Sequence, residues 1–377
     1  MKLLFWFSLI FIVYTYLGYP LILFIWSRLF PKGVNKKYIE PFVSVVVTAY
    51  NEEKNIKGRV ENLLSQDYPH DKLEIIVVSD GSTNGTNDLI NQLHNELQPT
   101  TCNLQLITYT PRKGKPHALN LGVQEAKGEI LVFTDARQQF EKNAIRELIA
   151  NFSDPKVGCV SGELVFYEDS DSSIKTEMGT YWNYEKWIRK KEGEVGSVAG
   201  ATGSIYAIRK ELYRPLPDDI LLDDVLIPMN IVLAGYRTVF DSKALAYDRV
   251  SKDMAQEKGR KIRTLAGNWQ LIARYRTLLN PFKNPIFFQY ISHKVLRLLV
   301  PFCLIGLFVA ALFLRGVFYH LVLMTLILGI ILPYFEGNIT RLSILEKMSK
   351  LSRAFLSLNY FAFLGFFYFL KPRKNLW

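Results

Sequence analysis

The sequence predicts an α/β fold built on parallel strands and set between apolar segments long enough to cross a membrane. Three apolar runs, typical of strands buried on both faces, lie at residues 42–47, 75–78 and 130–133. Three amphipathic stretches of helical length lie at residues 53–65, 86–97 and 116–127. Gly128 follows the last of these, where a helix C-cap is expected. The alternation of strand and helix implies a sheet with right-handed crossover connections.

The average composition conceals two kinds of segment. Of the 377 residues, 49% are hydrophobic and 21% are charged, and the mean hydropathy is +0.08. Residues 3–26 carry no charge, and roughly 20 apolar residues are enough for a helix to cross ~30 Å of hydrocarbon. Further apolar blocks lie at residues 298–334 and 355–370. We therefore expect a transmembrane helix at 1–30, a polar domain at 40–255, an amphipathic interfacial segment at 256–292 and transmembrane helices at 293–377.

Basic residues after the first apolar block predict a cytosolic location for the polar domain of an integral cell-membrane protein. Arg28, Lys32, Lys36 and Lys37 follow that block, and such residues stay on the cytosolic side. A cleaved signal peptide is the alternative, but the run exceeds the ~7 to 15 residues of a signal core. The block at 355–370 either spans, which would leave basic residues outside, or lies in the membrane as a shallow or re-entrant helix.

The net charge of +11 is spread along the chain and increases beside the apolar segments. This pattern favours contact with anionic membrane lipids, and we expect no nucleic acid as a partner. The three cysteines have no paired spacing, so neither a disulfide framework nor a zinc site is predicted. Neither a Walker A sequence nor a Gly-x-Gly-x-x-Gly fingerprint follows the first strand, which removes the main support for a kinase or an NAD-dependent enzyme.

Polar residues follow three predicted strands at the points where the strands end. These residues are 48–52, 79–82 and 134–137. Ligands of open α/β sheets bind beyond the carboxyl ends of the strands, so we expect the three segments to line one crevice. A single aspartate after a strand is often a helix N-cap. Asp80 and Asp135 follow two separate strands, which favours a ligand site.

Five segments together resemble the family-two glycosyltransferases with the GT-A fold, a family that includes cellulose, chitin, hyaluronan and poly-N-acetylglucosamine synthases. The segments are VVVTAYNE at 45–52, VVSDGS at 77–82, KPHALN at 115–120, TDARQ at 134–138 and LDDVLIP at 222–228. The resemblance covers residues 42–269 and implies a mixed, mainly parallel sheet flanked by helices, with transmembrane helices at both ends. The region 40–255 would then be a cytosolic glycosyltransferase domain.

The resemblance implies a site for the nucleotide of a UDP-sugar donor. The residues it assigns to nucleotide binding are Ala49, Tyr50, Asn51, Glu52, Asp80 and Lys115. A pyrimidine offers a flat face to an aromatic ring and N–H donors to a carboxylate, which suits Tyr50 and Asp80. A plain turn is the alternative for Tyr50 and Asn51.

Asp135 matches the first aspartate of the family's Asp-x-Asp motif, which implies that it holds a divalent cation, Mg²⁺ or Mn²⁺, on the sugar diphosphate. Such ions take carboxylate and phosphate oxygens, so one aspartate can be enough. The second acidic position is Arg137, which leaves metal dependence open. Arg137 itself can neutralise a diphosphate oxygen.

Asp223 and Asp224 match the family's acidic pair, which implies Asp224 as the general base, Asp223 at the acceptor and inversion at the anomeric carbon. An attacking hydroxyl needs a carboxylate that takes its proton. The alternative is a helix N-cap with a favourable first turn, since residues 225–233 look helical.

The resemblance also implies acceptor and diphosphate contacts outside these motifs. Gly203 and Ser204 lie in a glycine-rich stretch that faces the acceptor in the family, although a plain loop is the alternative. Arg260 and Arg263 fall where processive synthases carry Gln-x-x-Arg-Trp and are assigned to the diphosphate. Thr264 replaces the tryptophan, which weakens the case for processive synthesis, and Trp269 is the substitute we assign to the acceptor. The segment that contains Arg260, Arg263 and Trp269 is also typical of an amphipathic helix that lies on the membrane surface.

The sequence therefore predicts an inverting hexosyltransferase that moves a sugar from a UDP-sugar to a growing polysaccharide or other glycan acceptor, with partners in polysaccharide export. Transfer of one sugar to a lipid or lipid-linked acceptor is the alternative. A catalytically silent subunit that binds nucleotide or glycan is a third reading. It would need the base or the metal-binding acid to be lost, and acids stand at both Asp135 and Asp224.

Overall fold

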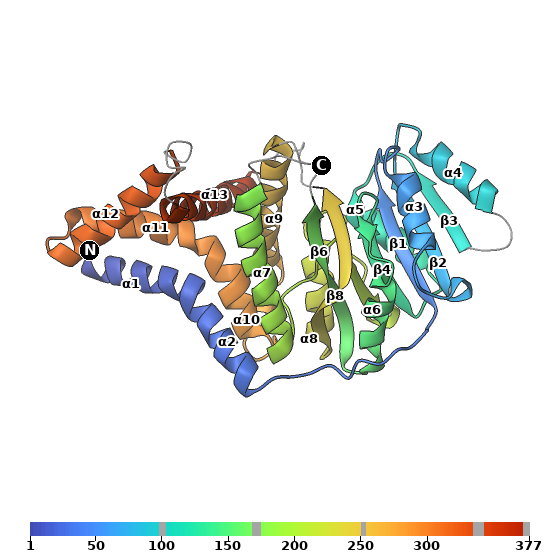
Figure 1. Cartoon of the computed structure of the whole chain (residues 1–377), viewed down its shortest axis with the longest axis horizontal. Coiled ribbons are helices and arrows are strands. Elements are labelled where there is room, and N and C mark those ends of the chain that lie inside the picture. The colour runs from blue at the N-terminus through green and yellow to red at the C-terminus, as the bar shows by residue number, and fades with distance from the viewer. Residues whose placement is uncertain (98–102, 168–174, 250–253, 335–342, 372–377) are drawn as a thin grey trace.

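The computed structural model describes residues 1–97, 103–167, 175–249, 254–334 and 343–371. The sheet-containing domain occupies one end of the long axis, and the apolar helices α1, α11 and α12 occupy the other (Figure 1). Between the two ends, α7 (Lys175–Val195) and α9 (Met254–Arg274) each cross that axis.

The domain is organised around one sheet of eight strands within the described residues. Their order is β3-β2-β1-β4-β7-β6-β8-β5. The strands are β1 Val43–Ala49, β2 Leu73–Asp80, β3 Asn103–Tyr109, β4 Ile130–Asp135, β5 Gln139–Phe140, β6 Val157–Tyr167, β7 Tyr206–Arg209 and β8 Arg237–Arg249. β3, β2, β1 and β4 are parallel, β7 is antiparallel to both neighbours, and β6 is parallel to β8. The predicted fold class, a mixed and mainly parallel sheet, is confirmed.

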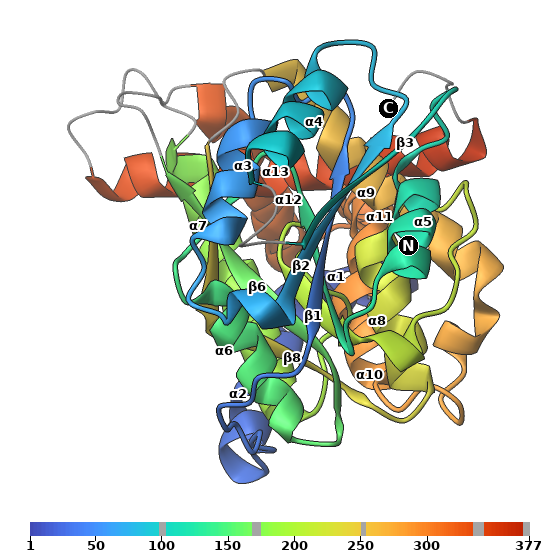
Figure 2. The ribbon, with the colours of Figure 1, turned by 90° about the vertical axis from the view of Figure 1, so that its right-hand side faces the viewer.

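Helices cover both faces of the sheet, which explains the apolar runs. On one face lie α3 (Ile56–Leu64), α4 (Thr86–Leu97) and α6 (Ala144–Ala150), and on the other lie α5 (Lys115–Glu125) and α8 (Asp223–Leu233) (Figure 2). Val45 and Val47 of β1 join the core beneath α3 and α6, whereas Val46 joins the core beneath α5 and α8. A strand buried on both faces needs apolar residues at successive positions, which is the pattern the sequence has.

The predicted strands end at one edge of the sheet. Thr48 of β1 is in register with Asp135 of β4, and Ala49 is in register with Ser79 of β2. The polar residues that follow these strands therefore lie at the same carboxyl edge, as parallel pairing requires.

The expected C-cap at Gly128 is wrong. Helix α5 ends at Glu125, and its cap, Ala126, has an extended backbone. Gly128 instead passes close to β1, where its N–H donates to Ser44 Oγ (2.7 Å) and an added Cβ would lie 2.5 Å from Ser44 N. The absence of a side chain is required by this close approach.

In the part of the chain that the structure describes, four helical segments are long and apolar enough to span a membrane. They are Lys2–Leu29, Phe287–Phe313, Val317–Tyr334 and Ile344–Leu370. The second begins about three turns before the predicted start at residue 298, because α10 continues through a π-helical turn into α11. Leu3, Phe7, Val317 and Met324 are exposed apolar side chains, as lipid contact requires.

The apolar segments are built from shorter elements. These are α1 Lys2–Val13, a π-helical turn at Tyr14–Gly18, α2 Tyr19–Leu29, α10 Phe287–Tyr290, a second π-helical turn at Ile291–Val295, α11 Leu296–Phe313, α12 Val317–Ile331 and α13 Ser343–Leu370. Short 3₁₀ turns lie at His70–Lys72, Asn151–Ser153, Lys210–Leu212 and Arg276–Leu279.

Candidate active site

Lys115 lies between two carboxylates at the carboxyl edge of the sheet. Its Nζ is 2.8 Å from Asp135 Oδ1, at the end of β4, and 3.6 Å from Asp223 Oδ2, at the start of α8. Burial alone would lower the pKa of Lys115, but the carboxylates of Asp135 and Asp223 raise it above its usual value. Lys115 is therefore cationic, and residues from three separate segments meet at it.

Asp224 follows directly and faces a tight turn. The turn is closed by Ile205 N–H donating to Thr202 O (2.9 Å), with Gly203 and Ser204 at its corner. An added Cβ at Gly203 would lie 2.9 Å from Asp224 Oδ2. Ala201 N–H donates to the backbone oxygen of Asp224 (2.7 Å), so the turn and the start of α8 are joined.

The environment of Asp224 suits a general base. Burial and, to a smaller extent, the neighbouring Asp223 raise the pKa of Asp224 to about 6, against the opposing charges of Lys115, Arg189 and Lys294. A carboxylate with a pKa near the working pH is both ionised and basic enough to accept a proton. Leu222 is the N-cap of α8, and the structure describes no capping bond from its side chain or from either aspartate, so the alternative of an aspartate N-cap is not supported.

Two buried hydroxyl groups beside the aspartates have no hydrogen-bond partner among the described residues. They are those of Ser204 and Tyr206. Buried polar atoms are rarely left unpaired, and unpaired ones indicate a place where water or a ligand binds.

Arg59, which belongs to no sequence motif, is a fully buried arginine behind the strand ends. Its Nη2 donates to Thr134 Oγ1 (2.8 Å), and Thr134 Oγ1 donates to Ser204 O (2.8 Å). Burial lowers the pKa of Arg59, and the nearby Asp135 opposes this effect. Arg59 thus joins the residue before Asp135 to the turn of Ser204, a link that only the fold creates.

Tyr50 directly follows β1 and lies beneath Arg112, an arginine outside the five sequence motifs. The Arg112 guanidinium lies 3.6 Å from the centroid of the Tyr50 ring. Asp80 holds the loop that carries Arg112, because Asp80 Oδ1 accepts from Lys113 N–H (2.7 Å) and from the Tyr109 hydroxyl (2.8 Å). Both Asp80 oxygens also accept from Gly114 N–H, so the carboxylate is already occupied by donors of its own chain.

The remaining residues predicted for the nucleotide border the same loop. Asn51 has a left-handed backbone (φ 55°), and its side-chain oxygen accepts from Thr83 N–H (2.9 Å). Glu52 accepts from the Asn55 side chain (2.6 Å). Ala49 is buried at the end of β1. The chain bends at Tyr50 and Asn51, directly after β1, which agrees with the local turn weighed as the alternative for these two residues.

Arg137 is turned away from Lys115 and Asp135. Its guanidinium pairs with Asp248 of β8, which also accepts from the Gln138 side chain (2.9 Å). Its predicted contact with the diphosphate would require this ion pair to break.

The residues predicted from the fifth family motif lie on α9, and no described contact joins them to the aspartates. Arg260 is 3.4 Å from Glu257 on its own helix. The Trp269 ring packs edge-on against Phe366 of α13, with centroids 5.2 Å apart. Arg263 has an electrostatic interaction with Tyr368 of the same helix. The interpretation of this stretch as an amphipathic helix fits these contacts better than stacking of Trp269 on an acceptor.

Helix α9 nevertheless lies directly against the segment before the acidic pair. An added Cβ at Gly267 would lie 2.5 Å from the Leu222 side chain. The Gln270 side chain accepts from Leu221 N–H and donates to Asp219 O, both at 2.9 Å.

Family models match most of this chain. A model of glycosyl transferase family 2 matches residues 44–216, and a model of glycosyl transferase family group 2 matches residues 131–335, more than half of the chain. The sheet and these family matches define a sugar-transferring enzyme of the GT-A type. The chain belongs to glycosyltransferase family 2, as the sequence motifs predicted.

Two relatives share part of their length with this chain. A probable glycosyltransferase of Bacillus subtilis (strain 168), YdaM, is 27% identical over 260 residues, which are 66% of this chain and 60% of that protein. The poly-beta-1,6-N-acetyl-D-glucosamine synthase of Staphylococcus aureus (strain COL) is 24% identical over 236 residues, 62% of this chain and 56% of that protein. The chain thus spans less than two thirds of the length of either relative.

A solved structure shares the fold over nearly the whole chain. It is the mannosyltransferase PcManGT from Pyrobaculum calidifontis in complex with GDP-Man and Mn²⁺, with a TM-score of 0.74. The match covers 98% of this chain and 100% of that one at 24% sequence identity, which shows the fold.

Proposed function

We propose that this glycosyltransferase moves a sugar from a UDP-sugar, with inversion, to a growing polysaccharide or other glycan acceptor at the cytosolic face of the membrane. The observation that carries the proposal is the meeting of Lys115, Asp135 and the Asp223–Asp224 pair at one edge of the sheet, opposite the turn at Gly203. Charges of both signs at the strand ends suit a donor whose leaving group is anionic and an acceptor that must lose a proton.

The transfer step uses Asp224 as the base. The acceptor hydroxyl gives its proton to the Asp224 carboxylate as its oxygen bonds to the anomeric carbon. The bond from that carbon to the diphosphate oxygen breaks, and the nucleoside diphosphate leaves with the electron pair. Lys115 lies where its positive charge stabilises the anionic leaving group.

The residues at Asp135 fit a divalent cation. The Asp135 side chain is 39% exposed at the strand end, so its carboxylate is accessible. Mg²⁺ and Mn²⁺ commonly bind through one or two carboxylates together with phosphate oxygens. Asp135 would hold the ion against the diphosphate, where it supplies charge stabilisation to the leaving group. Within the described residues no group of three acidic, histidine or cysteine side chains forms a separate site, which agrees with a cation held largely by the donor.

Tyr50 with Arg112 is the proposed platform for the nucleoside. A guanidinium stacked on an aromatic ring gives a flat, cationic surface, which suits a base and its attached phosphates. We assign Ala49, Asn51 and Glu52 to the rim of this platform and Asp80 to the support of its loop, through the bonds that Asp80 accepts from residues 113 and 114.

The alternative acceptor is a lipid or lipid-linked sugar that receives a single residue. Thr264 stands in place of the acceptor-stacking tryptophan of the fifth motif, and Trp269 is packed on Phe366. Both observations favour a short product. Polysaccharide export partners belong only to the processive case.

A donor screen with product sizing tests these proposals. Detergent-purified protein is given UDP-N-acetylglucosamine, UDP-glucose, UDP-galactose or GDP-mannose, the last because PcManGT was solved with GDP-Man. Each donor is supplied with Mg²⁺, Mn²⁺ or a chelator, and with an N-acetylglucosamine oligosaccharide or a membrane lipid extract. We expect UDP release that depends on a divalent cation and on an acceptor. Release from GDP-mannose alone would contradict the UDP assignment, and no release from any donor would favour a silent subunit.

A further inference from the structure

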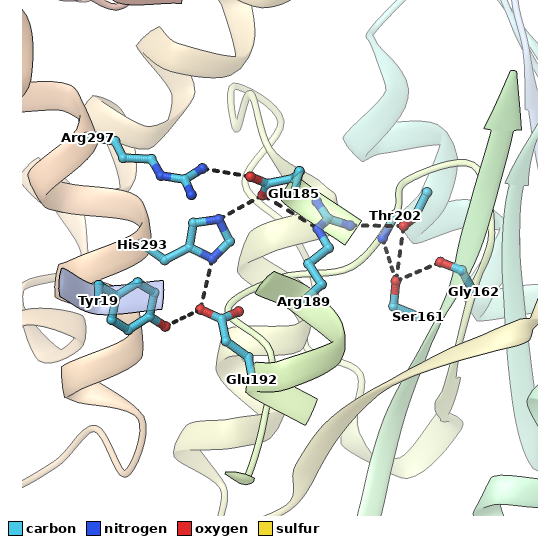
Figure 3. Close-up of polar contacts among 9 residues, drawn as sticks. All are labelled: Tyr19, Ser161, Gly162, Glu185, Arg189, Glu192, Thr202, His293 and Arg297. Atoms are coloured by element: carbon cyan, nitrogen blue, oxygen red, sulfur yellow. Dashed lines mark hydrogen bonds and ion pairs between the residues drawn. The ribbon is translucent and has the colours of Figure 1, made fainter. Parts of the chain in front are cut away.

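A buried cluster of charged side chains joins the apolar helices to the catalytic domain (Figure 3). Glu185, Arg189 and Glu192 lie at successive turns on one face of α7. His293, in the second π-helical turn, lies between the two glutamates, with Nε2 2.7 Å from Glu185 and Nδ1 2.9 Å from Glu192. Arg297 of α11 donates to the other oxygen of Glu185 (2.6 Å).

The cluster is closed to water and tied to a third element. Glu192 is fully buried, and the side chain of His293 is 2% exposed. Tyr19, the first residue of α2, donates to Glu192. His293 bridges the two glutamates through both of its ring nitrogens. Glu185 has a pKa held well below its usual value by His293 and Arg297, against the effect of burial.

Two of the apolar segments, Lys2–Leu29 and Phe287–Phe313, each contain a π-helical turn where they pass this cluster. The turns are Tyr14–Gly18 and Ile291–Val295, and they touch through the Tyr14 hydroxyl and Ser292 Oγ (2.8 Å). Such turns are rare and are frequent at functional sites. Tyr19 directly follows the first turn and donates to Glu192, whereas His293 lies within the second turn and contacts both glutamates.

The Arg189 side chain extends from this cluster toward the turn that faces Asp224. Its Nε is 3.7 Å from Glu185 Oε1, and its Nη1 donates to Thr202 Oγ1 (2.9 Å). Thr202 is the base of the turn that presents Gly203 and Ser204 to Asp224. Ser161 holds the same residue from the sheet, since Thr202 N–H donates to Ser161 Oγ (2.9 Å).

We infer that Arg189 is a positioning residue for transfer to the acceptor: anchored in the buried Glu185–His293–Glu192 cluster, it holds the turn at residues 202–205 against Asp224. This inference rests on the proposed function of the turn and of Asp224. It assigns the membrane helices a part in the reaction, because two of the anchoring side chains, His293 and Arg297, belong to the segment Phe287–Phe313. A turn displaced by a fraction of an ångström would misplace the acceptor hydroxyl while leaving the donor site intact.

The test compares two rates in the same protein. One is transfer from the best donor of the screen to the N-acetylglucosamine oligosaccharide, and the other is hydrolysis of that donor in water without acceptor. For Arg189→Gln we expect a fall of about tenfold or more in kcat for transfer. The KM for the donor and the hydrolysis rate, both measured at pH 8, stay unchanged, because no described contact joins Arg189 to Lys115 or Asp135. At that pH Asp224, whose pKa the charge of Arg189 lowers, is ionised with or without that charge. Lys190→Gln, an exposed neighbour with the same change of charge, is the matched control and behaves as the unmodified protein.

Replacing the hydroxyl of Thr202 tests the same bond by a smaller change of side chain. Thr202→Val removes the acceptor of the Arg189 bond and is expected to reproduce the loss in transfer, whereas Thr202→Ser keeps the hydroxyl and the rate. The double variant of Arg189→Gln with Thr202→Val should be no slower than Thr202→Val alone, because Thr202→Val already removes the Arg189 bond together with the longer bond from Ser161 Oγ (3.2 Å). Additive losses, an equal fall of hydrolysis and transfer, or an Arg189→Gln variant as fast as the unmodified protein would overturn the inference. An unmodified protein inactive with every donor would instead overturn the proposed function, and this inference with it.

Discussion

Asp224 is the carboxylate on which the proposed chemistry depends, and its replacement by an amide tests it directly. Asp224→Asn keeps the shape of the side chain and removes its ability to accept a proton. We expect kcat for transfer to fall by on the order of 10² to 10⁴, the usual contribution of a general base. The measurement is UDP release in the presence of acceptor.

Asp218→Asn serves as the control for this variant, because the Asp218 side chain is 65% exposed and outside the crevice. It should leave the rate unchanged. UDP release that persisted in Asp224→Asn at the unmodified rate would refute the assignment of the base.

The pH dependence of transfer follows from the same residue. The base must be ionised, and burial, followed by Asp223, raises the pKa of Asp224 to about 6. Activity is therefore present above pH 6 and lost as the pH falls through that value, instead of near pH ~3.9 as for a free aspartate. The check is kcat at saturating substrate between pH 5 and pH 8. A profile that stays flat down to pH 5 would contradict the prediction.

Gly203 gives a steric test of the turn. In Gly203→Ala the new Cβ would lie 2.9 Å from Asp224 Oδ2, closer than such contacts allow, so the turn or the carboxylate must shift. We expect kcat for transfer to fall by about tenfold or more, since a displaced base loses its alignment with the acceptor. Gly196→Ala is the matched control, because its nearest neighbour would be 3.8 Å away. Equal rates for the two variants would show that the turn does not hold the acceptor beside Asp224.

At the scale of elements, the strands and their ends could be predicted from the sequence, since their pattern is local. Apolar residues at consecutive positions of β1 and β4 fixed the type of sheet, and parallel pairing then brought Thr48 beside Asp135. Gly128 was misinterpreted because a glycine after a helix signals a C-cap and a close approach equally well. Only the packing of residue 128 on Ser44 separates the two.

Side-chain partners at the site depend on contacts between distant segments and were less accessible to prediction. Arg137 was expected at the diphosphate, yet its partner, Asp248, is 111 residues away in the chain. The buried Arg59 carries no motif, and its role follows from Thr134, 75 residues further on. A motif identifies which residues end a strand, but the neighbouring strand decides where a long side chain points.

Gly267 allows helix α9 to pack close to the segment before the acidic pair. An added Cβ at Gly267 would lie 2.5 Å from Leu222 and 3.0 Å from Leu221. Gly267→Ala therefore forces α9 away from the segment that leads into Asp223, and overpacking of this kind costs about 1–3 kcal/mol. We expect a lower Tm of the purified protein in detergent and slower transfer. Gly33→Ala, with nothing within 4 Å, is the control. An unchanged Tm in Gly267→Ala would show that the contact is not tight in solution.

At the scale of the whole molecule, the position of α13 decides on which side of the membrane the chain ends. By length and composition Ile344–Leu370 is able to span. Its contacts with α12 lie at the last turns of that helix, where Ser349 Oγ donates to Leu332 O (3.2 Å). A helix returning alongside α12 would bring its own last turns to the first turns of α12. Gly365 instead packs on Leu265 of α9, and α9 rests on the catalytic domain.

This arrangement predicts that α13 lies along the membrane surface on the side of the catalytic domain and that the C-terminus stays on that side. The basic residues Lys371, Arg373 and Lys374 then remain cytosolic with the other basic segments, which the positive-inside rule favours and a fourth span would violate. A protease-cleavable tag after Trp377 should resist external protease in cells with a permeable outer layer and an intact inner membrane. The same tag inserted between Arg315 and Gly316, in the connection between α11 and α12, should be cut, because that connection is predicted to face outward. Cleavage of the C-terminal tag with the catalytic domain still protected would mean that α13 crosses the bilayer, and its packing against α9 would then have to be absent in the membrane.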